Sequence, residues 1–423
     1  MRHRLIQTVL YITCCSIARS GDSIAWGAKP VAVDLATATA ARKAIAKGLA
    51  FLERTQGANG AWKAFDRAHP AITALALKCF AQDDRYGSQH RVVARAVEYL
   101  LTFVHPDGGL YVEGEGMRNY ETSVALMALA AVKDTRHAKV IRRAQEYLKM
   151  LQWDGGEGYE AGSSWYGGAG YGKHQRPDLS NTQLMLEALA QSGLPRTDPV
   201  YQKALVFVSR CQMLGKTNDQ AFAVESVDGG FIYTAANGGE SKAGTHIVRG
   251  RPQLRSYGSM TYAGFKSMLY AGLSHDDPRV VKAVAWIARN YTLDRNPNLP
   301  DETSLQGLYY YFHTFARALH AWGEETIRDA RGQSHRWRKD LCEKLVALQR
   351  DDGSWVNSED RWYEGNPQLV TAYAVLAMQT ALGDVPSLTE GDLHAGSSSH
   401  VRRTPPTVTR VSSRSAGSGS NLP

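Results

Sequence analysis

The chain has few cysteines. Cys14 and Cys15 lie near the N-terminus, and Cys79, Cys211 and Cys342 each stand alone in an apolar stretch. No Cys-x-x-Cys pair and no Cys/His spacing typical of zinc occurs, which excludes the common structural zinc sites. An odd number of isolated cysteines is typical of buried free thiols, not of a disulfide framework. We therefore predict no metal site and no cofactor.

Dense basic runs and membrane-spanning apolar runs are also missing. The formal net charge is +8, but the basic residues of the core are scattered, so nucleic acid is not an expected partner. The apolar run from Leu5 to Ala18 is too short to span a bilayer comfortably. Because it follows Arg2 and Arg4, we interpret residues 1–20 as a secretory signal peptide, with a frayed helix as the alternative. The protein is then secreted or periplasmic.

The two ends of the chain differ from its middle. Residues 21–41 are predicted to be a linker. Residues 383–423 are rich in Ser, Thr, Pro and Gly and are predicted to be a disordered tail. The chain of 423 residues is 43% hydrophobic, which is enough for a large core. We expect that core in residues 42–382.

Six similar helical units fill residues 42–382. The second helix of each unit is headed by a threonine, namely Thr73, Thr122, Thr182, Thr261, Thr314 and Thr371. These second helices are apolar nearly all round, apart from Glu187, Lys266 and Arg317, whereas the first helices carry more charge on one side. Six hairpins with polar outer and apolar inner helices can close on themselves. We therefore predict an all-α fold, an (α/α)6 toroid in which the threonines start the inner helices at one end.

Glycine-rich turns bearing an aromatic residue join the two helices in five of the six units. They are Gly60-Ala-Trp62, Gly109-Leu-Tyr111, Gly158-Tyr159, Gly230-Phe231 and Gly353-Ser-Trp355. Glycine permits the positive φ of such a turn, and the aromatic ring packs back against the unit. Two long insertions, 153–176 and 214–258, fall between a first and a second helix. They are predicted to wall a binding site at one end of the toroid.

Two of these turns carry a family resemblance. The segments that begin at Gln56 and Gln349 and end at Trp62 and Trp355 both fit the pattern QxxxGxW. The pattern resembles the repeat of the squalene and oxidosqualene cyclases and of the protein prenyltransferase β subunits, over about residues 42–382. The resemblance implies the toroid fold and an apolar or isoprenoid-like ligand. It implies a structural role for the two tryptophans.

The catalytic motifs of these relatives are missing. Cyclases of the squalene-hopene type carry DxDDTA at the head of an inner helix, and the matching stretch begins at Asp178. Ser180 and Asn181 stand where the family has its second and third aspartates. A hydroxyl cannot protonate an alkene, because that step needs a carboxylic acid kept neutral. The zinc ligands of the prenyltransferases are missing too, with Val370 where the histidine is expected, and the Cys-Gly-Glu-Gln stretch of thioester domains does not occur.

The candidate site residues gather at the predicted mouth. Asp178 is the candidate catalytic residue, or alternatively a helix cap whose pKa is lowered by the helix dipole. On either reading we expect it to be ionised at neutral pH. The candidate ligand-binding residues are Ser180, Asn181, Trp165, Tyr166, Tyr257, Tyr262, Tyr310, His313, Trp362 and Tyr363. The alternatives are loop packing for the aromatic residues and a core position for His313.

Three hypotheses for function follow. The first is an exported terpenoid-cyclase-like protein that binds an elongated apolar or isoprenoid-like molecule and, if catalytic, is an isomerase or transferase; a peripheral membrane contact is compatible with such a ligand. The second is a non-catalytic binding module. The third is a carbohydrate-active enzyme on an (α/α)6 toroid, which would need two converging carboxylates, such as Asp178 with Glu364 or Glu121. An apolar bowl favours the first two, and a polar bowl rich in carboxylates favours the third.

Overall fold

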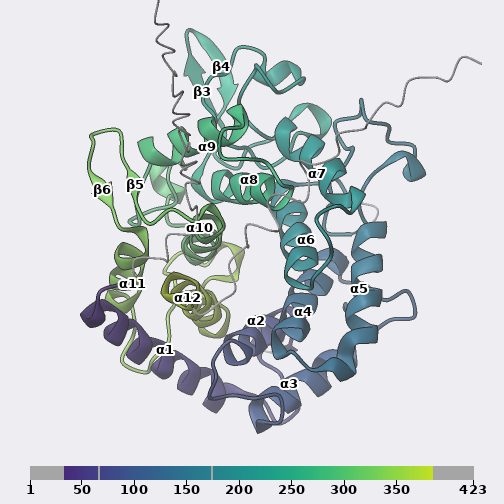
Figure 1. Ribbon diagram of the computed structural model, residues 1–423, viewed down its shortest axis with the longest axis vertical. Helices are drawn as coiled ribbons and strands as arrows, with labels where there is room; N and C mark the ends of the chain where they lie inside the picture. The colour runs from purple at the N-terminus through teal and green to yellow at the C-terminus, as the bar shows by residue number, and fades with distance from the viewer. Residues whose placement is uncertain (1–32, 65–66, 173–174, 384–423) are drawn as a thin grey trace, which may run out of the picture.

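The computed structural model describes residues 33–64, 67–172 and 175–383. Within these ranges the chain forms twelve α-helices that alternate between an outer and an inner ring (Figure 1). The outer helices are α1 (Leu35–Thr55), α3 (Arg91–Leu101), α5 (Ala138–Met150), α7 (Pro199–Arg210), α9 (Pro278–Arg289) and α11 (Trp337–Ala347). The inner helices are α2 (Pro70–Ala81), α4 (Arg118–Val132), α6 (Leu179–Gln191), α8 (Gly258–Tyr270), α10 (Leu308–Trp322) and α12 (Pro367–Leu382).

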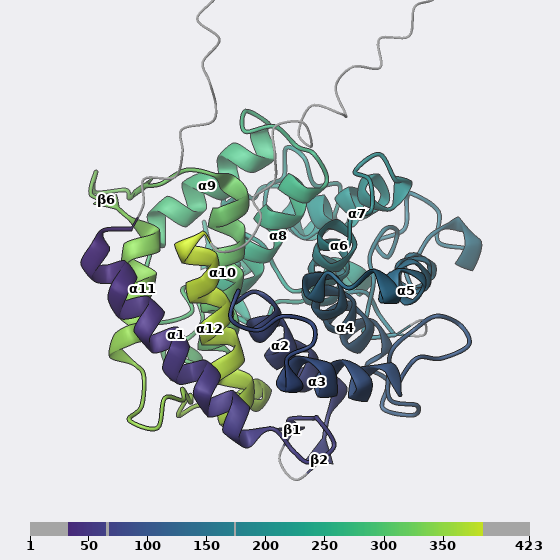
Figure 2. The ribbon, with the colours of Figure 1, turned by 60° about the horizontal axis from the view of Figure 1, so that its bottom comes forward.

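The inner helices form a closed ring. Each contacts the next inner helix in sequence, and α12 packs back against α2. The outer ring closes as well, because α1 packs against α11 and α12 (Figures 1 and 2). The inner helices are buried along most of their length, whereas the outer helices bury one face, as their charge patterns predict. The predicted (α/α)6 toroid is confirmed.

The remaining elements are short. Three two-stranded hairpins pair β1 (Lys63–Ala64) with β2 (Arg67–Ala68), β3 (Thr245–Val248) with β4 (Arg251–Leu254), and β5 (Ile327–Arg328) with β6 (Ser334–His335). Six 3-10 turns are η1 (Thr135–His137), η2 (Gly155–Glu157), η3 (Ala221–Ala223), η4 (Ala236–Gly238), η5 (Asp301–Thr303) and η6 (Arg361–Tyr363). The two predicted insertions hold η2, η3, η4 and the β3–β4 hairpin. In the described ranges, every helix is too short or too polar to span a bilayer.

Three of the predicted segments lie at the ends of the chain. The predicted signal peptide and nearly all of the predicted tail lie outside the described residues. The predicted linker is too long at its C-terminal end, because α1 already begins at Leu35. Asp34 starts this helix by accepting a hydrogen bond from the backbone N–H of Thr37 at 3.1 Å. Its short side chain is the signal that sequence reasoning passed over.

The repeated threonines fasten each turn to its inner helix. The backbone N–H of Trp62 donates to Thr73 Oγ1 at 3.0 Å, and that of Trp355 donates to Thr371 Oγ1 at 3.1 Å. The same bond recurs from Leu110 to Thr122, from Ala169 to Thr182 and from Phe231 to Thr261. In the fifth unit, which lacks the turn, Thr314 lies deeper in α10, and its hydroxyl donates to the carbonyl of Tyr310 four residues earlier, as those of Thr73 and Thr261 do in their helices. The threonine therefore recurs because its hydroxyl oxygen accepts a hydrogen bond from a backbone N–H of the turn in each of five units.

The glutamines of the turns join neighbouring units. Gln349 Nε2 donates to the carbonyl of Gly353 at 3.0 Å and to that of Ala44 in α1 at 2.9 Å, which closes the ring between the last and the first unit. The equivalent pairs of acceptors are Gly60 and Val92 for Gln56, Gly167 and Val200 for Gln152, and Gly229 and Arg279 for Gln212. Gly353 has φ +87°, and a Cβ there would lie 2.6 Å from the carbonyl oxygen of Lys47. Only glycine fits against the neighbouring outer helix at this point.

The third turn was assigned to the wrong glycine. Gln152 and Thr182 bind the segment from Gly167 to Ala169, not Gly158-Tyr159. Tyr159 instead stacks on Trp165 inside the insertion, with ring centroids 5.0 Å apart. The insertion separates Gln152 from its glycine, and Gly158-Tyr159 has the glycine and aromatic residue by which the other turns are identified.

Candidate functional site

A small chamber lies where the six inner helices meet. Its volume is about 20 Å³, and side chains of all six inner helices line it. The lining residues are Leu75, Lys78, Tyr120, Val124, Met127, Ser180, Gln183, Leu184, Glu187, Lys266, Tyr310, His313, Thr314 and Tyr373. Ser180 and Tyr310 of its lining lie near the N-terminal ends of α6 and α10, and we call this end of the chamber, where the candidate residues were expected, its mouth.

Helical spacing places polar groups on the chamber faces of α6 and α10. Ser180, Gln183 and Glu187 are three and four residues apart on α6, so they point to the same side at increasing depth. Tyr310 and His313 have the same relation on α10. The chamber therefore descends from hydroxyl and amide groups near the mouth to a charged base.

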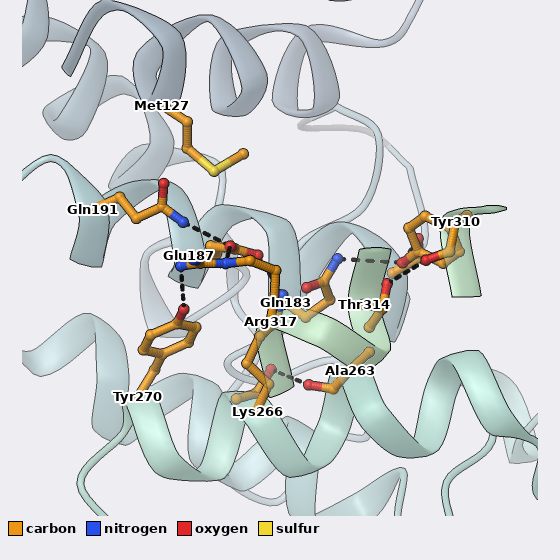
Figure 3. Close-up of polar contacts among 12 residues, drawn as sticks. Met127, Gln183, Glu187, Gln191, Ala263, Lys266, Tyr270, Tyr310, Thr314 and Arg317 are labelled. Carbon is orange, nitrogen blue, oxygen red and sulfur yellow. Dashed lines mark hydrogen bonds and ion pairs between the residues drawn. The ribbon is translucent and has the colours of Figure 1, made fainter. Parts of the chain in front are cut away.

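Tyrosine and serine hydroxyls form the upper layer of the chamber. The Tyr310 hydroxyl lies 3.1 Å from Ser180 Oγ and accepts a hydrogen bond from Gln183 Nε2 at 3.2 Å (Figure 3). On the other side, the hydroxyls of Tyr120 and Tyr373 lie 3.4 Å apart. These groups can orient a ligand hydroxyl or an oxyanion.

The base of the chamber is a buried ionic cluster. Glu187 of α6 forms ion pairs with Lys266 of α8 and with Arg317 of α10, whose Nε lies 2.6 Å from Glu187 Oε1 (Figure 3). Burial alone would raise the pKa of Glu187, but the charges of Lys266 and Arg317 outweigh it and hold the pKa well below its usual range. Arg317 also donates to the hydroxyl of Tyr270 at 3.2 Å. The base of the chamber is therefore charged, because the three charged residues of the otherwise apolar inner helices meet there.

Lys78 of α2 extends this cluster. Its Nζ donates to Gln191 Oε1 at 2.7 Å and lies 3.6 Å from the sulfur of Met127, and Gln191 in turn donates to Glu187 at 2.6 Å. Burial lowers the pKa of Lys78 to about 7. The amide of Gln191 therefore connects Lys78 to Glu187 without a direct ion pair.

Asp178 caps α6, as one of its two interpretations predicted. Its Oδ1 accepts the backbone N–H of Asn181 and its Oδ2 accepts the side-chain amide of Asn181, both at 2.8 Å. The predicted lowering of its pKa is wrong, because burial outweighs these hydrogen bonds and raises the pKa to about 6. An acid with that pKa is still mostly ionised at pH 7. Asp178 therefore caps α6, and its carboxylate also makes a hydrogen bond with the side chain of Tyr233.

The structure divides the predicted ligand-binding residues. Ser180, Tyr310 and His313 line the chamber. Tyr262 does not, because it is buried on the far side of α8 against Tyr311 and Phe315, with ring centroids 5.7 and 5.0 Å away. The ring of Tyr262 therefore packs in the core, outside the chamber lining.

The other predicted residues lie around the mouth or in the loops. Trp165 packs in an aromatic cluster of the insertion, and its Nε1 donates to Asn237 at 2.9 Å. Trp362 and Tyr363 are exposed on η6. Of the remaining predicted residues, Tyr166 is half-buried, and Asn181 and Tyr257 are buried. None of the three lines the chamber. The position of Trp165 fits the alternative interpretation, in which the aromatic residues of the insertion pack within the loop.

The carboxylates proposed to pair with Asp178 also serve the backbone. Glu364 accepts the N–H groups of Tyr309 and Tyr310 at the start of α10, at 3.1 and 2.7 Å. Glu121 Oε2 accepts the N–H of Val112 at 3.0 Å. Burial raises the pKa of both glutamates to about 7. Each of the three carboxylates is thus committed to a different inner helix or turn, an arrangement that differs from the converging pair of a glycosidase.

His69 forms a cluster with two glutamates that has the composition of a metal site. Its Nε2 lies 3.3 Å from Glu115 Oε2 and 3.5 Å from Glu121 Oε1. Its Nδ1 accepts the N–H of Ala71 at the start of α2, at 3.2 Å. A neutral imidazole that accepts at Nδ1 carries its proton on Nε2, so Nε2 donates to Glu115, whereas Glu121 Oε1 accepts no hydrogen bond. The geometry fits a hydrogen-bonded histidine that caps a helix better than a metal ligand.

A larger cleft opens at the other end of the inner ring. Its volume is about 360 Å³, and it is lined by Arg42, Ile45, Gln82, Asp83, Asp84, Arg85 and Gln379. Arg85 and Asp83 pair with each other at 2.7 Å on its wall. The chamber is the better candidate site, because its buried polar groups come from every inner helix.

Sequence reasoning missed the deepest part of the site. Glu187, Lys266 and Arg317 were noted as interruptions of apolar helices, but they were not joined into a cluster. Lys78 is likewise a charged residue within an otherwise apolar inner helix, α2. A charged residue within a helix that is otherwise buried all round indicates a partner on another helix.

Comparison with known proteins supports the superfamily. The family model for the squalene-hopene cyclase C-terminal domain matches residues 64–236. A probable squalene-hopene cyclase of Sinorhizobium fredii is 30% identical over 173 residues, which cover 36% of this chain and 26% of that relative. The chain thus spans about a quarter of the length of the curated relative that it matches.

Solved structures share the fold at low sequence identity. A variant of the type II terpene cyclase MstE from Scytonema, in complex with geranylgeranyl dihydroxybenzoate, matches with a TM-score of 0.52 and 15% identity, over 83% of this chain and 99% of that chain. An α-1,6-mannanase variant from Salegentibacter sp. HEL1_6, in complex with α-1,6-mannotriose, matches with a TM-score of 0.52 and 8% identity, over 82% of this chain and all of that chain. The resemblance to the squalene cyclase and prenyltransferase superfamily is confirmed, and the similarity to the mannanase is one of fold.

Proposed function

We propose that this chain, a toroid of the squalene cyclase and prenyltransferase superfamily, binds an isoprenoid-like molecule at its central chamber without cyclising it. The observation that carries the proposal is the chamber itself, to which all six inner helices contribute. We further propose that the protein acts after export, since residues 1–20 have the pattern of a signal peptide.

The lining of the chamber suits an amphiphile. Leu75, Val124, Met127 and Leu184 form an apolar wall on α2, α4 and α6. Tyr310 and Tyr373 face it from α10 and α12, and tyrosine rings present an apolar face together with a polar hydroxyl. The present volume of about 20 Å³ holds roughly one water molecule. A longer ligand would therefore occupy the mouth, with only one end inside the chamber unless side chains there rotate.

The chemistry of the site favours binding over cyclisation. The proton donor of the related cyclases is replaced by Ser180, whose hydroxyl lies against that of Tyr310. Asp178, the remaining carboxylate of that stretch, uses both oxygens as a cap and is mostly ionised at pH 7. Neither group can supply a strong neutral acid to an alkene.

Binding is tested with isoprenoids of graded length. We expect the purified protein to bind a geranylgeranyl compound in isothermal titration. Val124→Trp, which fills the apolar wall next to the chamber, should weaken that affinity about tenfold or more by occluding the site. Val281→Trp, on the exposed side of outer helix α9, is the matched control and should bind as the wild type does. Binding of α-mannosides in place of isoprenoids would favour the carbohydrate hypothesis and contradict this proposal.

Squalene should not be converted by this protein. Incubation of the wild type with squalene, followed by gas chromatography, is expected to return only the starting material. Ser180→Asp alone should remain inactive, because the surrounding hydroxyls and charges were not arranged to keep that acid neutral. A cyclised product from the wild type would contradict the argument from the missing acid.

A further inference from the structure

We propose that the base of the chamber is an anion site that takes the carboxylate or phosphate head group of the bound molecule. This inference rests on the proposed function and names the polar end of the ligand. It depends on the charges buried at the base of the chamber, on the position of Lys78 and on two polar atoms without partners.

The buried charges do not balance. Lys78, Lys266 and Arg317 carry three basic groups, and Glu187 is the single carboxylate that the ion pairs of the described residues bring to this cluster. All four side chains are at least nine-tenths buried. Even with Lys78 neutral, one positive charge remains in excess. Burying a charge without a counter-charge is costly, so a ligand that supplies one negative charge gains the compensation that the protein lacks.

Lys78 is the group placed to receive that charge. Lys266 and Arg317 are already paired with Glu187, whereas the contacts of Lys78 are the neutral Gln191 amide and the sulfur of Met127. An ammonium group has three N–H donors, and a thioether is a weak acceptor. Lys78 lines the chamber, so an oxyanion there can accept its remaining hydrogen bond and replace the weak one.

Two buried polar atoms of the chamber lining have no partner. Gln183 uses its Nε2 on the hydroxyl of Tyr310, and its Oε1 is unsatisfied. His313 Nδ1 is unsatisfied as well, although the residue is buried and stacks on Tyr373. Native proteins leave few such atoms without a hydrogen bond. A head group that brings its own hydroxyl, or a water molecule bound to a carboxylate, supplies the missing donor.

The inference is tested by removing the negative charge from the ligand and, separately, the positive charge from Lys78. Isothermal titration compares geranylgeranoic acid with geranylgeraniol, which share the chain but differ in charge. For the wild type, we expect the acid to bind about tenfold or more tighter than the alcohol, the ratio that one charge-assisted hydrogen bond supplies. Lys78→Met should abolish this preference, so that the acid binds no tighter than the alcohol does. Lys43→Met, the same change on the exposed face of α1, should keep the wild-type ratio.

A second variant guards against misfolding. Lys78→Gln keeps a polar group without the charge, and the circular dichroism spectrum and thermal midpoint of each variant are measured first. Folded variants that still prefer the acid would overturn the anion site and leave the proposed function standing. If isoprenoids do not bind but inorganic phosphate or acetate binds the wild type and not Lys78→Met, the anion site is supported and the isoprenoid proposal fails. If none of the probes binds, both proposals fail.

Discussion

Replacing Glu187 with alanine should cost the protein roughly 3–5 kcal/mol of its free energy of unfolding. Glu187 forms ion pairs with Lys266 and Arg317, and the three residues lie on three different inner helices. All three side chains are almost wholly buried. Without the carboxylate, two cations face each other in the core with no counter-charge. The side chains are too deeply buried for bulk water to compensate these charges, so the loss is far greater than at a surface ion pair.

The measurement is urea unfolding followed by circular dichroism. The matched control is Glu146→Gln on outer helix α5, which removes the exposed pair with Lys149 and should change the free energy of unfolding by less than about 1 kcal/mol. The triple variant Glu187→Leu, Lys266→Met and Arg317→Leu should recover most of the loss, because apolar residues of similar volume replace buried ion pairs at little cost. A single variant as stable as the control would contradict the assignment of Glu187 as the centre of the cluster.

Trp62→Ala and Trp355→Ala should each destabilise the fold by roughly 3–5 kcal/mol. Both indole rings are fully buried. Trp62 Nε1 donates to the carbonyl of Leu52 and Trp355 Nε1 to that of Leu345, each at 2.8 Å. Truncation to alanine leaves a large cavity and removes the indole hydrogen bond to the carbonyl in the core of the unit. Thermal unfolding by calorimetry gives the size of the loss.

The control for these variants is Trp362→Ala. Trp362 is 46% exposed on the short turn η6, so its loss should change the free energy of unfolding by no more than about 0.5 kcal/mol. Ligand binding provides a second readout, since Trp62 and Trp355 are outside the chamber lining. We expect the folded fraction of both variants to bind the geranylgeranyl compound with wild-type affinity. An unchanged melting temperature in either variant would mean that the tryptophan is not a structural anchor.

The sequence by itself determined the ring and much of its mouth. Hydrophobic periodicity depends on which side of each helix meets water, so it distinguished outer from inner helices without any contact being known. The repeated threonines placed the mouth end, and the spacing of Ser180 and the tyrosines before Thr314 brought Ser180 and Tyr310 to it. These are local properties, fixed by residues a few positions apart on one helix.

Only the tertiary structure decided what fills the centre. Glu187, Lys266, Arg317 and Lys78 are on four different helices, and no local pattern states that their side chains converge. The pKa of Asp178 was predicted in the wrong direction for the same reason. The helix dipole that lowers it is local, whereas the burial that raises it comes from residues far along the chain. Long-range burial and charge pairing arise only when the ring closes. They give the chamber between the otherwise apolar inner helices a charged base.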